Sequence, residues 1–201
     1  MQTPTHVLLA ALAFSAANAA DTNLLPNGDF SNAAVASGWS CAGIFGSHAW
    51  TGDDADAFPT SGSIEVSAHA VLDGPNSWLE GLEICNSACF DVRPGSAYAY
   101  GGHSRLAAVA GGPGSSFAMY FSCGVYAQSG CSGLPTWLPA PSMSAASAWT
   151  LPALVDGALP ANAVSASCQI QTIADGENGS GTGHFDSLFF TTDTIFANGY
   201  E

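Results

Sequence analysis

Short apolar segments that alternate with polar residues recur along this chain and constrain its fold more than any other feature. Ile64, Val66 and Ala68 fall on one side of an extended segment, and the polar residues Glu65 and Ser67 fall on the other. A period of two predicts a β-strand with one face packed on a core and the other in water. Further strands are predicted at 82–92, 97–107, 116–126, 163–173 and 184–190.

Turn-forming residues separate these segments. The sequence reads RPG at 93–95, GGPG at 111–114 and DGENG at 175–179, and Gly and Pro in such positions favour tight turns. Short strands joined by short connections pair antiparallel. The sequence therefore predicts an all-β fold, a sandwich or barrel, with antiparallel sheets.

The first residues are typical of an export signal. An apolar run at 7–14 precedes small residues that include Ala17 and Ala19, the pattern that a signal peptidase cleaves, although His6 is the only basic side chain before it. The run is shorter than the roughly 20 apolar residues that cross a bilayer. We expect a signal peptide at 1–19, one β-sandwich domain at 20–190 and a tail at 191–201, in a secreted or cell-surface protein without membrane insertion.

The charge balance limits the partners. The chain has 2 Lys and Arg residues against 16 Asp and Glu residues, a net charge of −14. Nucleic acids and anionic lipids are bound through Lys and Arg, so this acidic protein is expected to bind neither. Carbohydrates and other neutral surface polymers, divalent cations and basic proteins stay open as partners.

Six cysteines follow the predicted leader, an even number that favours disulfides in an exported chain. Local pairing would join Cys85 to Cys89 and Cys123 to Cys131, which leaves Cys41 with Cys168 as the long-range bridge; this is one of several possible pairings. A zinc site is the alternative, but the C-x3-C at 85–89 has no matching second half and no His at ligand spacing.

Aromatic rings outside the expected core are the candidate ligand contacts, because sugar binding needs ring faces and a few polar groups. These rings are Trp50, Trp78, Tyr120, Tyr126 and Trp137. Trp78 and Trp137 are the preferred pair, since Gly, Asn, Ser and Pro surround them. For each ring taken singly, core packing is the competing interpretation.

Catalysis finds little support in the sequence. Glycoside hydrolysis needs two carboxylates that face each other, and the nearest candidates are Glu80 and Glu83. On a strand, residues three positions apart point to opposite faces, so the two cannot form that pair. The acidic run DDAD at 53–56 lacks the remainder of a calcium-binding loop and is interpreted as a solvated loop. We expect no enzyme activity, with a small glycoside hydrolase as the least supported function.

Several short motifs together resemble a known family. They are NLLPNGDF at 23–30, Gly38-Trp39, Ser61-Gly62-Ser63, the VRPGSAY segment at 92–98 and Phe185-Asp186. In this order they resemble the CenC-like carbohydrate-binding modules, which have a galactose-binding-like jelly-roll fold. The resemblance implies an antiparallel jelly-roll β-sandwich whose two ends meet, with Phe30 and Trp39 buried.

The same resemblance implies a structural Ca²⁺. The family's ligands map to the carboxylate and carbonyl of Asp186 and to the main-chain carbonyls of Asp29 and Gly62. Oxygen ligands of this kind suit a hard cation. The chain departs from the family at Ser31, where many members have Glu.

The predicted function is that of an exported, non-catalytic module that binds carbohydrate or another surface polymer. The alternative is a structural or adhesive extracellular protein that uses the same sandwich for protein contacts. The ending IFANGYE at 195–201 resembles a short C-terminal sequence of exported Gram-negative bacterial proteins, which agrees with either function. The alternative interpretation is a frayed terminus with one apolar anchor.

Overall fold

Two antiparallel sheets form the protein in the computed structural model, which describes residues 23–31, 37–57, 61–74, 77–141, 143, 146–150 and 153–193. Sheet A has the spatial order β1 (Trp39–Ile44), β6 (Gly81–Ser87), β12 (Ser165–Asp175), β9 (Ser116–Tyr126) and β10 (Thr136–Trp137), with β7 (Phe90–Asp91) also pairing with β12. Sheet B has the order β11 (Ala153–Ala158), β8 (Ala97–Ala110), β13 (Ser180–Asp193), β3 (Ser63–His69) and β2 (Gly46–Thr51).

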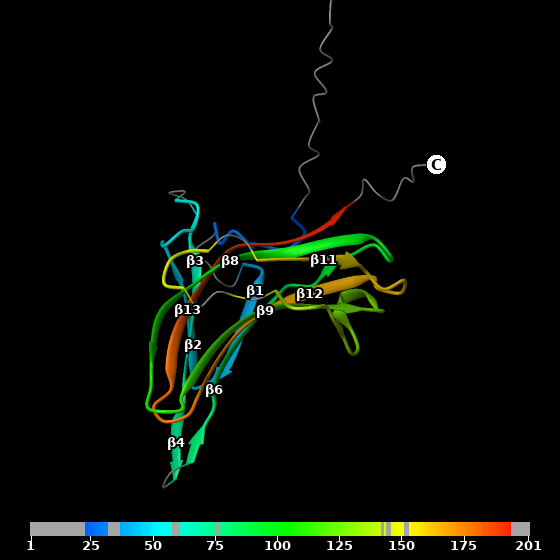
Figure 1. Cartoon of the computed structure of the whole chain (residues 1–201). Coiled ribbons are helices and arrows are strands. Elements are labelled where there is room, and N and C mark those ends of the chain that lie inside the picture. The colour runs from blue at the N-terminus through cyan, green and yellow to red at the C-terminus, as the bar shows by residue number, and fades with distance from the viewer. Residues whose placement is uncertain are drawn as a thin grey trace, which may run out of the picture.

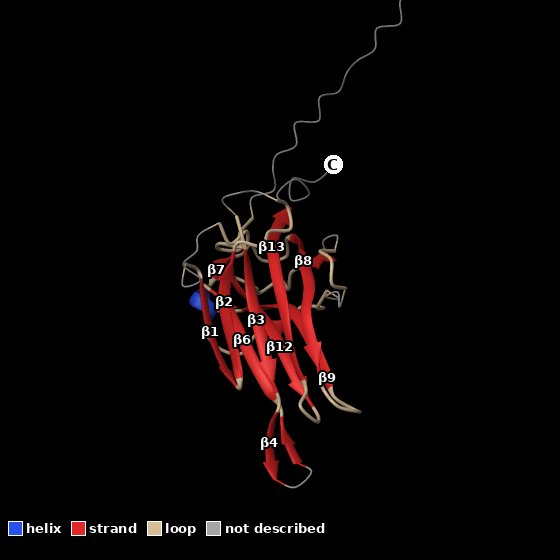
Figure 2. Ribbon diagram, turned by 90° about the vertical axis from the view of Figure 1, so that its left-hand side faces the viewer, coloured by secondary structure: helices blue, strands red, loops and turns tan. Residues whose placement is uncertain are grey.

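The two sheets bend together. Sheet A, with β6, β9 and β12, lies on the inner side of the bend, and β8 and β13 of sheet B lie on the outer side (Figure 1). A separate hairpin of β4 (Val71–Gly74) and β5 (Ser77–Leu79) extends from one end of the sandwich (Figure 2). The one short helix of the described residues is the 3₁₀ turn η1 (Ser129–Cys131), and no helix there is long and apolar enough to cross a membrane.

The core lies between the sheets and has an aromatic centre. The Tyr100 ring of sheet B packs edge-on against Phe121 of sheet A, with centroids 5.6 Å apart, and stacks on Phe190 at 5.9 Å. Phe121, Phe185 and Phe190 are fully buried. Burial of large rings contributes about 2–3 kcal/mol each, so these positions hold the two sheets together.

The predicted all-β antiparallel sandwich is confirmed. The alternation in β3 is observed, with Ile64 and Val66 fully buried, and the strand predicted at 116–126 has the bounds of β9. The final strand is longer than predicted and runs over Ser180–Asp193. Its added glycines have a packing reason, because a Cβ on Gly181 would lie 2.3 Å from the Phe117 ring.

The N-terminal motif lies beside the final strand, as the resemblance implied, but it forms turns and not a strand. The Leu24 amide donates to the Phe190 carbonyl at 2.8 Å, and the Leu188 amide donates to the Gly28 carbonyl at 2.8 Å. Phe30 is fully buried and packs at 5.7 Å on Trp39, which is 4% exposed. The predicted burial of both rings is confirmed.

All six cysteines form disulfides, as predicted, but the predicted pairing is wrong. The bonds are Cys41–Cys85, Cys89–Cys131 and Cys123–Cys168. Two of them join residues directly opposite each other on neighbouring strands, β1 with β6 and β9 with β12. Proximity in the sheet, and not proximity in the sequence, decides the partner.

Candidate functional site

The solvent-facing side of sheet A carries exposed aromatic rings. In β9, Phe121 and Cys123 are fully buried, so the alternation of the strand places Tyr120, Ser122 and Gly124 on the opposite side. The Tyr120 ring is 43% exposed there. This side of the sheet is the inner side of the bend seen in Figure 1.

Trp137 joins the same face from the edge strand β10. It pairs with Gly124 in β9, and a Cβ built on Gly124 would lie 3.3 Å from the indole ring. Glycine at this position therefore leaves room for the indole to lie over the sheet. The ring is 52% exposed, and the Cys89–Cys131 disulfide anchors the loop that leads to it.

Polar side chains lie beside these rings, on the strands that follow β9 across the sheet. The register places Gln171 of β12 opposite Tyr120, and Gln169 opposite Ser122. Asn86 of β6 continues the second row, opposite Gln169. Side-chain amides can both donate to and accept from hydroxyl groups. Rings and amides on one sheet face are the groups that an oligosaccharide needs.

Tyr126 is the third predicted ring on this face, at the end of β9. Its hydroxyl lies 3.2 Å from the Ser167 hydroxyl of β12, and its ring is half-buried. Along β9, Tyr120 and the Gly124 position beneath Trp137 are about 13 Å apart at the usual rise of a strand. The face therefore suits an extended chain of sugars better than a single sugar.

The other two predicted rings lie elsewhere. The Trp50 indole in β2 donates to the Phe30 carbonyl at 2.9 Å and packs on Gly62, where a Cβ would lie 2.7 Å from the ring. Packing alone accounts for Trp50. Trp78 lies in β5 of the projecting hairpin, so the preferred pair of Trp78 and Trp137 is not brought together on one face.

The solvent-facing side of sheet B is covered by the chain itself near its centre. The Ala55 amide donates to the carboxylate of Asp186 in β13 at 2.8 Å, which brings the acidic loop onto the sheet. From the opposite direction, the Leu106 amide of β8 donates to the Ala146 carbonyl at 2.8 Å. Beyond these segments, residues of β3, β8 and β13 that are mostly small line a shallow hollow, and no tyrosine or tryptophan is among them.

A charged cluster lies beneath that cover. His184 has its Nε2 atom 3.4 Å from Glu65 and its Nδ1 atom 3.5 Å from Asp53, which also pairs with Arg105. Burial, and then the Arg105 charge, lower the pKa of His184, while the two carboxylates oppose this. The run at 53–56 was predicted as a solvated loop. It is instead held on the sheet by the Asp53–Arg105 ion pair and by the hydrogen bond from the Ala55 amide to the Asp186 carboxylate.

Asp186 is a fully buried carboxyl group in the middle of β13, beside the point where β2 ends and β3 begins. We call this point the Asp186 corner. It accepts hydrogen bonds from the amides of Ala55 at 2.8 Å and Ser187 at 2.6 Å. Burial raises its pKa to about 7; the two amides oppose the rise, and the neighbouring Asp54 adds to it. The Ser187 hydroxyl also donates to Asp56 at 2.8 Å, so the acidic loop lies directly beside Asp186.

The three predicted calcium ligands come from segments that meet at this corner. Leu188 binds the Gly28 carbonyl, next to Asp29, and Phe185 pairs with Ile64, so Asp186 continues the register at the end of β3 that follows Gly62. The Ser61 hydroxyl donates to the Asp29 carbonyl at 2.7 Å. The donors are oxygen atoms throughout, which fits a hard cation.

We expect the contribution of Asp186 to the unfolding free energy of the metal-free protein to fall as the pH rises. The pKa of Asp186 is about 7 in the folded chain and 3.8 in an unfolded one, so its contribution is full below about pH 4 and is lost as the pH rises through 7. The slope is at most about 1.4 kcal/mol per pH unit. The lowered pKa of His184 acts in the opposite direction below pH 6.5.

The measurement is urea unfolding in chelator between pH 4 and pH 8, for the parent and for Asp186→Asn. We expect the unfolding free energy of Asp186→Asn to increase relative to that of the parent as the pH rises, because Asn carries no charge. A difference that stays constant over this range would contradict the assignment.

The carboxylates considered for catalysis are separated. Glu83 is buried between the sheets, where it contacts His48 at 2.7 Å, and Glu80 is exposed in the connection before β6. They do not face each other, since one side chain is buried and the other is exposed. Glu80 lies outside β6, so the spacing rule for a single strand does not apply to this pair. Sequence reasoning missed Asn86, Gln169 and Gln171, although the alternation in β6 and β12 placed them on the face opposite the core.

No family model matches this chain, and no curated protein matches it. Among solved structures, the enzymatically active domain of bacteriophage CBA120 tailspike protein 4 aligns over 85% of this chain and 21% of that chain, with a TM-score of 0.56 and 13% identity. The CBM22-1 and GH10 modules of Clostridium thermocellum endo-1,4-β-D-xylanase 10B, complexed with xylohexaose, align over 89% of this chain and 30% of that chain, with a TM-score of 0.50 and 15% identity.

The neighbours also include TmCBM61 in complex with β-1,4-galactotriose, at a TM-score of 0.49 and 11% identity over 86% of this chain and 99% of that chain. The alignment with the CBM22-1 and GH10 modules, at a TM-score of 0.50, confirms the predicted jelly-roll fold and the resemblance to carbohydrate-binding modules at the level of the fold alone. A fold alone hosts many functions, so the function has to be argued from the site.

Proposed function

We propose that this protein is an exported, non-catalytic carbohydrate-binding module whose binding surface is the solvent-facing side of sheet A. The observation that carries the proposal is the exposure of Trp137 and Tyr120 on the same face as Gln169 and Gln171. Ring faces bind the C–H side of a sugar, and the amides on the neighbouring strand bind its hydroxyl groups. Three disulfides agree with an extracellular location.

The chemistry of the face favours a neutral polysaccharide. The rings and amides that line it carry no charge, and the chain as a whole has a net charge of −14, which repels acidic glycans. The distance between the two exposed rings requires several linked sugars to contact both. The proposed ligand class is therefore a neutral, extended polysaccharide.

Affinity electrophoresis and calorimetry against soluble neutral polysaccharides test this proposal, with an acidic polysaccharide for comparison. Binding to at least one neutral chain, and tighter binding to long oligosaccharides than to short ones, is expected. If no polysaccharide binds and the protein instead associates with itself or with protein partners, the adhesive function replaces it.

We further propose that Ca²⁺ binds at the Asp186 corner as a structural ion. Asp186 would supply its carboxylate and carbonyl, and Asp29 and Gly62 their carbonyls. The fit rests on the buried carboxylate of Asp186. Burial raises its pKa to about 7, and a bound cation would favour the charged form of the group. The carboxylates of Asp54 and Asp56 lie beside it and add negative charge.

Calcium is expected to raise the melting temperature at neutral pH. A ligand at 100 times its Kd stabilises the fold by about 2.7 kcal/mol, which is several degrees for a domain of this size. The measurement is thermal unfolding at pH 7.5 in excess Ca²⁺ and in chelator, with Asp186→Asn as the variant that should not respond. An identical melting temperature of the parent in both solutions would sink the calcium proposal.

A further inference from the structure

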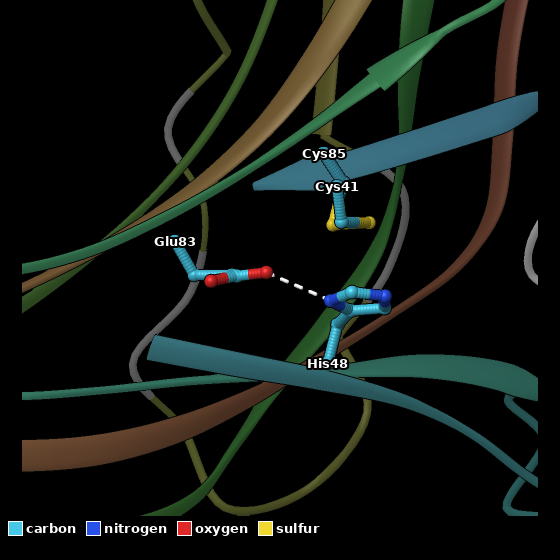
Figure 3. A group of neighbouring side chains, drawn as sticks. All are labelled: Cys41, His48, Glu83 and Cys85. Carbon is cyan, nitrogen blue, oxygen red and sulfur yellow. Dashed lines mark hydrogen bonds and ion pairs between the residues drawn. A yellow bond between two sulfur atoms is a disulfide. The ribbon is translucent and has the colours of Figure 1, made fainter. Parts of the chain in front are cut away.

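Four side chains of metal-binding type meet at the edge of the sandwich formed by β1 and β2. They are Cys41, His48, Glu83 and Cys85, and their ligand atoms all lie within 4.8 Å of one another. Figure 3 shows the imidazole and the carboxylate directed toward each other beside the two sulfur atoms. None of these residues belongs to the proposed glycan face or to the Asp186 corner.

The backbone holds this cluster in place. Cys41 and Cys85 are directly opposite each other in β1 and β6. The Glu83 carboxylate fits between two glycines, since a Cβ on Gly43 would lie 2.0 Å, and one on Gly46 2.7 Å, from its Oε2 atom. Glu83 is therefore buried, with 4% of its side chain exposed, while the His48 side chain is 36% exposed and open to solvent.

In the oxidised protein the two sulfur atoms are bonded to each other, and a disulfide sulfur is a poor metal ligand. His48 Nδ1 then contacts Glu83 Oε1 at 2.7 Å. Two thiolates, an imidazole and a carboxylate together are a donor set typical of Zn²⁺. In a tetrahedral zinc site neighbouring ligand atoms lie roughly 3.3–3.8 Å apart, so small side-chain movements suffice after the S–S bond is broken.

We propose that reduction of the Cys41–Cys85 disulfide converts this cluster into a Zn²⁺ site with Cys41, His48, Glu83 and Cys85 as ligands. A thiol or phosphine reductant supplies two electrons, the S–S bond breaks, and each sulfur takes a proton. When Zn²⁺ binds, both thiol protons pass to solvent and two S–Zn bonds form. His48 provides the Nδ1 lone pair as a neutral imidazole, and Glu83 binds as the carboxylate.

The disulfide and the proposed metal site would connect different parts of the sandwich. The disulfide links β1 to β6 within sheet A, whereas His48 belongs to β2 of sheet B. A metal ion held by all four residues would therefore connect the two sheets, which the disulfide does not do. The reduced protein is expected to be stabilised by Zn²⁺, and the oxidised protein to bind it weakly.

The Cys123–Cys168 disulfide is the matched control in the same sheet. These residues are also directly opposite each other on neighbouring strands, with a Cα separation of 4.0 Å against 3.9 Å for Cys41–Cys85. Both are buried in the core, and neither belongs to a group of ligand-type side chains in the described residues. Among the residues that the structure describes, thiols at this position have no third or fourth ligand beside them.

The test uses the full chain, reduced with a phosphine under argon and titrated with Co²⁺ as a spectroscopic substitute for Zn²⁺. We expect one equivalent to give thiolate-to-cobalt charge-transfer absorption and tetrahedral d–d bands, both reversed by Zn²⁺. His48→Ala and Glu83→Gln are expected to bind at least about tenfold more weakly. Cys41→Ser/Cys85→Ser should abolish the bands, and Cys123→Ala/Cys168→Ala should keep them.

Circular dichroism of the same samples shows whether reduction unfolds the chain. If the reduced chain is unfolded, the proposal requires Co²⁺ to restore the β spectrum in the parent and not in His48→Ala. Absence of charge-transfer bands overturns the proposal. So do bands that persist at full affinity in both His48→Ala and Glu83→Gln, since these would report thiols alone.

Discussion

Replacing Trp137 and Tyr120 together by alanine is expected to weaken polysaccharide binding about 100-fold. Each exposed ring offers a face for sugar stacking, and the loss of such a contact typically costs more than about 1 kcal/mol, which corresponds to roughly tenfold in Kd. Both rings are about half exposed, so the fold should change in stability by less than about 1 kcal/mol. Calorimetry with the best-binding polysaccharide measures the first effect, and thermal unfolding the second.

Trp78→Ala is the matched control, because Trp78 lies in the β4–β5 hairpin outside both sheets. It removes a ring of the same kind from the same protein, and we expect unchanged binding. Equal losses in Trp78→Ala and in the double variant would move the site to the hairpin.

Removal of the Cys123–Cys168 disulfide by double alanine substitution is expected to cost about 4 kcal/mol of unfolding free energy. The bond closes a loop with a sequence separation of 45, for which the chain-entropy estimate is about 4 kcal/mol. Both sulfur atoms also pack in the core. A domain of this size should lose roughly 10 °C in melting temperature.

The single substitutions Cys85→Ala and Cys89→Ala distinguish the disulfide pairing in the structure from the local pairing of Cys85 with Cys89. If Cys85 were bonded to Cys89, either substitution would free the other of these two thiols. The structure instead predicts that Cys85→Ala frees Cys41 and that Cys89→Ala frees Cys131. Alkylation of the non-reduced variants followed by peptide mapping identifies the free thiol, and a thiol freed at position 85 or 89 would contradict the structure.

Patterns of local origin were predictable from the sequence. The alternation in β3 predicted a strand and its buried face, because burial of every second side chain is a property of the strand alone. The turn-forming residues between short apolar segments predicted the class of fold. The disulfides were not predictable in the same way. Cys41 meets Cys85 only because β1 pairs with β6, and strand order is not visible in residue spacing.

Among the candidate rings, too, some positions follow from the local sequence and others only from the fold. Tyr120 was predicted to lie outside the core, and its place in the alternation of β9 is enough to expose it. Trp50 and Trp137 were both candidate contacts, and Trp137 was preferred for its loop-like neighbours. In the structure Trp50 donates to the Phe30 carbonyl, whereas Trp137 lies over Gly124 in a strand of two residues. The zinc-type cluster was missed because its residues come from three strands.

The most direct test of glycan binding at sheet A is an NMR titration of the protein with an oligosaccharide that binds to it. The titration follows the indole N–H signals of the five tryptophans. We expect the Trp137 signal to move, together with backbone amides near Tyr120 and Gln171. The signals of Trp39 and Trp50 should stay, because their indoles donate to the Asn27 and Phe30 carbonyls. Saturable movement of Trp78 or Trp149 with an unmoved Trp137 would contradict a binding site on this face.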